Sequence, residues 1–151
     1  MTGKTKKTIL VSILGLALIA AFIGYKMYNK KHFSVEAATP AASLSAAELH
    51  NTFATDSVTA KSKFIGDETN HKVIEVSGEV SATSTDQQQH TVIKLKTATD
   101  GAFINCEMEG GAGSIKAGDK ITIKGICNGY LFEADLGIPG DVNMNRCFIK
   151  K

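Results

Sequence analysis

An uncharged run of eighteen residues near the N-terminus constrains this chain more than any other feature. Residues 8–25 read TILVSILGLALIAAFIGY, without Asp, Glu, Lys or Arg. As a helix with about 1.5 Å rise per residue, this run is roughly 27 Å long, close to the hydrocarbon thickness of a bilayer. Tyr25 and Tyr28 stand where interfacial aromatic residues are common. The sequence therefore predicts one transmembrane helix over residues 8–25, within an N-terminal membrane anchor of residues 1–31.

A cleaved signal peptide is the alternative interpretation of this run. Signal peptides have a shorter apolar region, about 7 to 15 residues, followed by a small-residue cleavage site. Here KMYNKK follows the run, and a candidate cleavage site, Val35-Glu36-Ala37-Ala38, comes only later. Lysines flank both ends of the run, so the positive-inside rule does not decide its orientation. The short basic N-terminal tail favours a retained anchor with the rest of the chain exported.

Charge is distributed unevenly along the chain. Six lysines and no acidic residue lie in residues 1–31, so the remainder carries 17 − 6 = 11 basic and 15 acidic residues, a net charge of −4. A nucleic-acid-binding domain usually presents a basic patch. The composition therefore disfavours polyanion binding and indicates a mildly acidic domain behind a basic membrane-flanking segment.

Residues 32–44 are rich in Ala, Ser and Thr and are predicted to form a linker. Ser45 and Glu48 then match a capping box, which predicts that a helix begins here. Leu49, Phe53 and other apolar residues recur at helical spacing up to Phe64, and Gly66 is a plausible stop. One amphipathic helix is therefore expected to pack on a core.

Beyond this helix the hydrophobic pattern changes to a period of two. Alternating segments at residues 71–80, 90–97, 102–108, 119–130 and 142–150 are separated by polar or glycine-rich stretches. Gly78 and Gly125, inside two of these segments, are typical of bulges or bends in a small barrel. The pattern predicts a mainly β fold over residues 45–151: one helix followed by five strands forming a small sandwich or barrel.

The phrases KVIEVSGEV, INCEM, AGDKITIKGICNGYL and GDVNMNRCFI carry a family resemblance. They resemble the tRNA-anticodon-like OB-fold family of small bacterial membrane-anchored or lipoprotein-type envelope proteins. The resemblance covers roughly residues 45–150 and implies a five-stranded OB-type barrel, without implying tRNA binding. Together with the predicted anchor and its basic tail, it gives the bacterial inner membrane as the expected location, with the soluble domain exported to the periplasm.

Three cysteines, an odd number, cannot all pair within the chain. Cys127 and Cys147 fall in the last two predicted strands, which could be neighbours, so an exported domain is expected to carry a Cys127–Cys147 disulfide. Cys106 would then be a buried free thiol. No C-x-x-C or paired-histidine spacing indicates a zinc site, and no metal is predicted.

No catalytic constellation is recognisable, so the chain is not expected to be an enzyme and no cofactor is predicted. The four histidines, His32, His50, His71 and His90, are interpreted as solvated surface residues. OB barrels bind ligands across their second and third strands, where the candidate binding residues are Lys94, Lys96, Phe103 and Asn105. The predicted function is a membrane-anchored, non-catalytic binding or scaffold module of the cell envelope with a protein or glycan partner. The alternative is binding of single-stranded nucleic acid.

Overall fold

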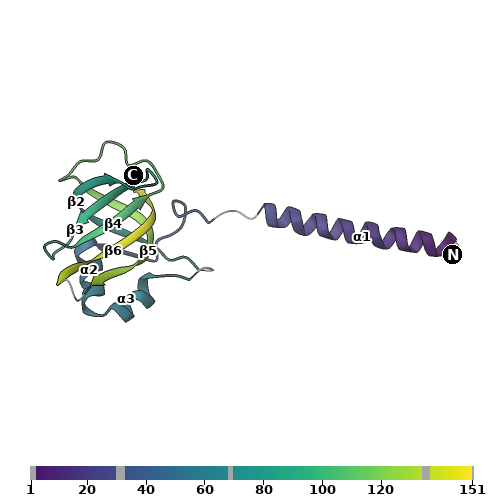
Figure 1. Cartoon of the computed structure of the whole chain (residues 1–151), viewed down its shortest axis with the longest axis horizontal. Helices are drawn as coiled ribbons and strands as arrows, with labels where there is room; N and C mark the ends of the chain where they lie inside the picture. Colours follow the sequence, from purple (N-terminus) through teal and green to yellow (C-terminus); the bar gives the residue numbers. More distant parts are fainter. Residues whose placement is uncertain (1–2, 30–32, 68–69, 134–136, 151) are drawn as a thin grey trace. The chain divides into compact units, whose positions relative to one another are not determined.

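The structure, a computed structural model, describes residues 3–29, 33–67, 70–133 and 137–150. The side chains of residues 3–12, Leu14 and Glu133 lie outside the described set. The chain divides into two units, Met1–Phe33 and Ser34–Lys151 (Figure 1). We call the second the barrel unit.

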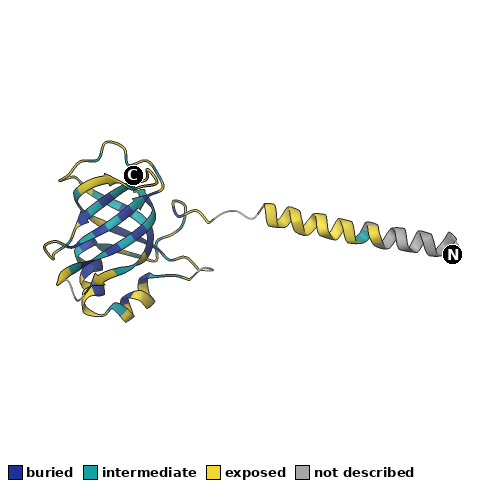
Figure 2. Ribbon diagram, in the orientation of Figure 1, coloured by how far each residue is buried: buried dark blue, intermediate teal, exposed yellow. Residues whose placement is uncertain are grey.

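The first unit consists of helix α1, Gly3–Tyr28. Its described side chains are almost all exposed, including Leu16, Ile19 and Phe22, which are 59–68% exposed (Figure 2). Within the part of the chain that the structure describes, no helix combines the length and the apolar character needed to cross a membrane. Residues 8–12 and Leu14 of the predicted transmembrane span have side chains outside the described set. Membrane anchoring stays a prediction.

The barrel unit contains the five predicted strands. They are β2 (Val73–Thr85), β3 (Thr91–Lys96), β4 (Phe103–Met108), β5 (Lys120–Glu133) and β6 (Ile138–Ile149). Their order around the sheet is β2-β3-β4-β6-β5, and β5 pairs back with β2 (Figure 1). Only the β4–β6 pairing is parallel among these five described strands. The mainly β, closed five-stranded barrel confirms the expected OB-type fold.

The segment before the helices also belongs to this sheet. Residues Ala42–Ser45 form strand β1, which runs parallel to β2 with Ala42 opposite Ile74. Val35, further upstream, is only 1% exposed and packs with Val73 and Ile126. Much of the segment predicted to be a linker is therefore in contact with the barrel strands.

Two helices stand where the sequence predicts one. Helix α2 spans Ala46–Thr55 and helix α3 spans Ser57–Phe64. The predicted capping box is present, because the Ser45 side chain accepts from the Glu48 amide and the Glu48 carboxylate accepts from the Ser45 amide. The prediction of one continuous helix is wrong, since Asp56 has non-helical dihedral angles and its carboxylate accepts from the amides of Val58 and Thr59. Asp56 thus stops one helix and caps the next.

The apolar faces of these helices cover the barrel core. Helix α2 contacts β1, β2, β3, β4 and β6, and α3 contacts β5. The predicted stripe is buried, and its four members are Leu49, Phe53, Ala60 and Phe64. Buried and less buried positions alternate along the strands (Figure 2). Inward residues such as Ile93, Leu95 and Ile104 are fully buried. The period-two pattern therefore identified the inner face of the barrel correctly.

The strand ends and bends depend on tertiary contacts. Residues 81–85, predicted to belong to a polar turn, continue β2 and pair with β3. At Gly125 the β5–β6 register shifts, as predicted for a bulge, and an added Cβ would lie 2.5 Å from the Cys147 sulfur. A side chain at position 125 would therefore collide with the core.

Candidate functional site

The four candidate binding residues predicted from the sequence do lie together on β3 and β4. Lys94 is opposite Asn105 and Lys96 is opposite Phe103. The Lys94 ammonium lies 5.6 Å from the centre of the Phe103 ring, within cation–π range. Lys96 forms an ion pair with Glu79 on β2. Both lysines thus already have partners within the barrel unit.

A carboxylate that the sequence analysis did not consider also lies on this face. Asp141 of β6 accepts a hydrogen bond of 2.8 Å from the Phe103 amide and one of 3.0 Å from the Asn105 side-chain amide. Asn105 also donates to the Asn143 side chain at 3.1 Å. The predicted face is therefore mixed in charge and internally hydrogen-bonded, which is poorly suited to a phosphate backbone.

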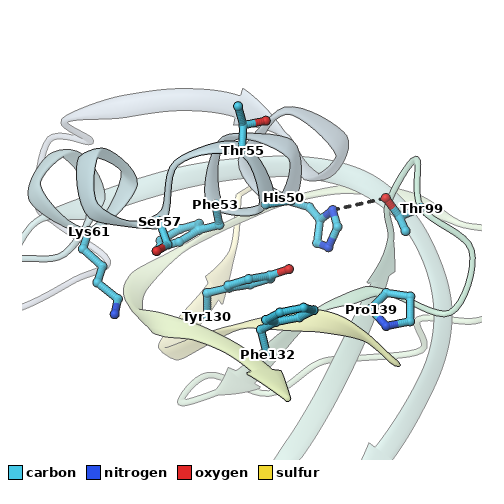
Figure 3. Close-up of a pocket in the computed structure, with 10 residues that line it drawn as sticks. His50, Phe53, Thr55, Ser57, Lys61, Thr99, Tyr130, Phe132 and Pro139 are labelled. Carbon is cyan, nitrogen blue, oxygen red and sulfur yellow. Dashed lines mark hydrogen bonds between the residues drawn. The ribbon is translucent and has the colours of Figure 1, made fainter. Parts of the chain in front are cut away.

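A separate pocket of about 570 Å³ lies between the two helices and the β5–β6 hairpin (Figure 3). Its volume falls within the usual range for small-molecule sites. Among the described residues that line it, Lys61 alone carries a formal charge at neutral pH. The lining comprises His50, Phe53, Ala54, Thr55, Ser57, Lys61, Thr99, Tyr130, Phe132 and Pro139.

Three aromatic rings form a ladder along one wall of this pocket (Figure 3). Phe53 and Tyr130 have ring centres 5.9 Å apart, and Tyr130 and Phe132 have ring centres 6.0 Å apart with planes only 5° from parallel. Phe53 is buried, whereas Phe132 is 55% exposed. The ladder therefore extends from the core to an aromatic ring in contact with solvent, a platform on which a flat ligand can stack.

His50 is buried at the back of the pocket, so its interpretation as a surface residue is wrong. Its Nε2 lies 3.0 Å from the Gly140 carbonyl oxygen, which can only accept, so Nε2 carries a proton. Its Nδ1 lies 3.5 Å from the Thr99 hydroxyl. The imidazole therefore joins helix α2 to β6 through Gly140 and holds the pocket wall in place.

This pocket was not predicted from the sequence, although one local pattern indicates part of it. In the run Tyr130-Leu131-Phe132, alternation along a strand puts the two rings on one face and Leu131 on the other. The structure agrees with this alternation, because Leu131 is 67% exposed and the Tyr130 and Phe132 rings stack on each other. No comparable sequence pattern predicts the residues that the helices add to the pocket. His50 and Lys61 reach the β5–β6 hairpin only because α2 and α3 dock beside it.

The predicted Cys127–Cys147 disulfide is absent, and the three cysteines are free, buried thiols, none at disulfide distance from another. The strand register explains this, because Cys127 lies opposite Met144, whereas Cys147 lies opposite Met108. Burial raises the pKa of the Cys127 thiol to about 12. Hydrogen bonding to Cys106, together with burial, raises the pKa of Cys147 well above its usual value. These thiols are therefore unreactive core residues.

The sequence profile of the tRNA_anti-like family matches residues 1–136, more than half of the chain. The chain belongs to the tRNA_anti-like family. The match includes α1, both later helices and β2 to β5, and ends before β6. No curated protein matches this member of the family.

Proposed function

We propose that this tRNA_anti-like protein is a membrane-tethered, non-catalytic binding module of the bacterial cell envelope, and that its barrel unit binds a glycan. The exposed end of the Phe53–Tyr130–Phe132 ladder carries the proposal. A sugar ring has an apolar face of C–H groups that packs on an aromatic ring, and a rim of hydroxyls that needs hydrogen-bond partners. OB barrels are a frequent scaffold for oligosaccharide binding.

The polar lining of the pocket supports a neutral or weakly anionic glycan. Thr55, Ser57 and Thr99 are hydroxyl-bearing residues of its lining, and Lys61 adds one cationic residue. Hydroxyl groups both donate and accept, so they suit the mixed donors and acceptors of a sugar. A nucleic acid would require several cations along its backbone, and the Asp141 carboxylate and the net charge of −4 outside residues 1–31 oppose it.

Binding of the full-length protein to immobilised bacterial oligosaccharides tests this proposal. Phe132→Ala is expected to weaken glycan binding tenfold or more, which corresponds to about 1.4 kcal/mol, because it removes the stacking platform. Leu131→Ala is the matched control, since Leu131 is the exposed neighbour that the pocket does not include. Salt-sensitive binding to a single-stranded oligonucleotide, with no glycan bound, would instead favour the nucleic-acid alternative.

The tether is supported by residues 8–25 and by the apolar side chains exposed on α1. We expect the full-length protein to stay in the membrane fraction after an alkaline carbonate wash. The double substitution Leu16→Lys and Ile19→Lys is expected to move it to the soluble fraction, because charges in a bilayer are costly. Val58→Lys, at a 77% exposed position of the barrel unit, should leave the distribution unchanged. Release of the unaltered protein by carbonate would refute the anchor.

Protease added to spheroplasts tests the orientation separately. Cleavage of the barrel unit without breaching the inner membrane is the result expected for a periplasmic domain. Protection until the membrane is opened would place the barrel unit in the cytoplasm.

A further inference from the structure

A cluster of one histidine and two carboxylates lies apart from the pocket and does not include the four candidate binding residues on β3 and β4. Asp86 and His90 flank the turn between β2 and β3, and Glu107 belongs to the neighbouring strand β4. The His90 Nδ1 lies 3.4 Å from the Asp86 Oδ2 and 3.1 Å from the Glu107 Oε1. One ligand atom from each residue lies within 4.8 Å of the other two. Three potential metal ligands therefore converge on one point.

The turn holds the Asp86 carboxylate in a defined orientation. Its Oδ1 accepts hydrogen bonds of 2.8 Å from the amides of Gln88 and His90. The turn itself is closed by a 3.0 Å bond from the Asp86 amide to the His90 carbonyl, and Gln89 adopts a left-handed conformation with φ 67°. Because Oδ1 is occupied by backbone donors, Oδ2 is the oxygen directed toward the imidazole. This is the kind of support that orients carboxylates in metal sites.

A single imidazole nitrogen cannot satisfy both carboxylates. The Nδ1 of His90 carries at most one proton and can donate one good hydrogen bond, yet the Asp86 and Glu107 oxygens both lie near it. A cation bound by these three atoms would contact both carboxylates and the imidazole at once.

We propose that Asp86, His90 and Glu107 bind one divalent cation of the zinc type. Ligand bonds of about 2.0–2.2 Å in a tetrahedral site place ligand atoms roughly 3.3–3.6 Å apart, close to the two distances measured here. One imidazole with two carboxylates suits zinc and similar transition metals, whereas Mg²⁺ and Ca²⁺ prefer six or more oxygen ligands. The side chains of His90, Asp86 and Glu107 are 48%, 29% and 44% exposed, so water can fill the fourth position.

This site is independent of the proposed glycan pocket. His90 precedes β3, whereas the pocket residue Thr99 follows it, so the two sites lie at opposite ends of that strand. Bound metal would join the β2–β3 turn to β4 and stiffen this end of the barrel. We expect the thermal midpoint of the protein to rise when the cation is added, because a ligand that binds only the folded state stabilises it.

Calorimetric titration of the metal-free, reduced, full-length protein with Zn²⁺ tests the proposal. We expect one equivalent to bind, and His90→Ala and Glu107→Gln each to weaken binding at least tenfold, since loss of a supporting residue alone costs roughly 10–100-fold. Glu79→Gln is the matched control. Glu79 lies on β2, pairs with Lys96 and does not line the pocket that contains His90 and Glu107. Unchanged melting of His90→Ala without metal would show that the variant folds.

Co²⁺ spectroscopy identifies the ligands directly. An oxygen- and nitrogen-ligated site is expected to give weak visible bands that His90→Ala removes. Intense thiolate charge-transfer absorption would assign the metal to the cysteines and overturn the assignment. Binding that survives His90→Ala would overturn it too, because it would show that His90 is not a ligand. Absence of Zn²⁺ binding, or tighter binding of Mg²⁺ or Ca²⁺ than of Zn²⁺, would overturn it as well.

Discussion

Replacing Phe53 by alanine is expected to lower the free energy of unfolding by about 3–5 kcal/mol, the usual range for a buried Phe→Ala substitution. Phe53 is 1% exposed and lies between helix α2 and the barrel. Its ring centre is 6.1 Å from that of Phe64 and 5.9 Å from that of Tyr130. Truncation would leave a cavity where α2, α3 and β5 meet. Urea denaturation of the purified protein, compared with the unaltered chain, measures the loss.

Val58→Ala is the control for this substitution, because Val58 is 77% exposed on α3. Its effect on the free energy of unfolding is expected to stay within about 0.5 kcal/mol, as for most exposed positions.

Phe53→Ala is also expected to change ligand binding, which can be measured beside its stability. Phe53 supports Tyr130 and hence Phe132, so Phe53→Ala should also weaken ligand binding at the pocket. If Phe53→Ala lowers the free energy of unfolding by less than about 1 kcal/mol, the helices contribute little to the core.

The barrel unit is expected to lose stability steadily as the pH rises above about 9, because the raised pKa values of Cys127 and Cys147 keep these two thiols protonated in the folded state. Burial raises the pKa of Cys127 to about 12, from an unperturbed value of 9.0. Between these values the unfolded chain releases a proton that the folded chain retains, so rising pH favours unfolding. The contribution of the protonated Cys127 thiol to the free energy of unfolding is fully present below pH 9 and is lost toward pH 12. The maximum slope is about 1.4 kcal/mol per pH unit for each such thiol.

Comparison with a variant that lacks the thiol isolates the contribution of Cys127 to this decline. Cys127→Ala is expected to lower stability at neutral pH slightly and to flatten the decline above pH 9. Denaturation curves at several pH values give both quantities. An identical pH slope in the variant and the unaltered protein would show that the Cys127 thiol does not couple to folding.

Much of the barrel follows from local patterns. Residues 93–95 and 104–108 alternate between apolar and other residues, and the structure buries Ile93, Leu95, Ile104, Cys106 and Met108. Alternation is a property of each strand alone, because successive side chains point to opposite faces. The capping box at Ser45 is local in the same way, since its partners are three residues apart. Such features are readable without knowing the fold.

The errors come from interactions that compete locally or act at long range. At Asp56 a side-chain cap competes with continuation of the helix, and a helical apolar stripe carries no information about that break. The absent disulfide reflects strand register, because Cys127 and Cys147 lie on adjacent strands but opposite different residues. His50 is buried because a carbonyl from Gly140, 90 residues away, satisfies its ring.

Three features could be predicted from residue type and spacing within short stretches of chain. They are the charge-free N-terminal run, the acidic character of the remaining residues and the five alternating strands. Which side chains meet could not be predicted in this way, as the Phe53–Tyr130–Phe132 ladder and the convergence of Asp86 and His90 with Glu107 show. Barrel closure and strand register are set by packing between distant segments, and a shift of one residue would turn each side chain to the opposite face.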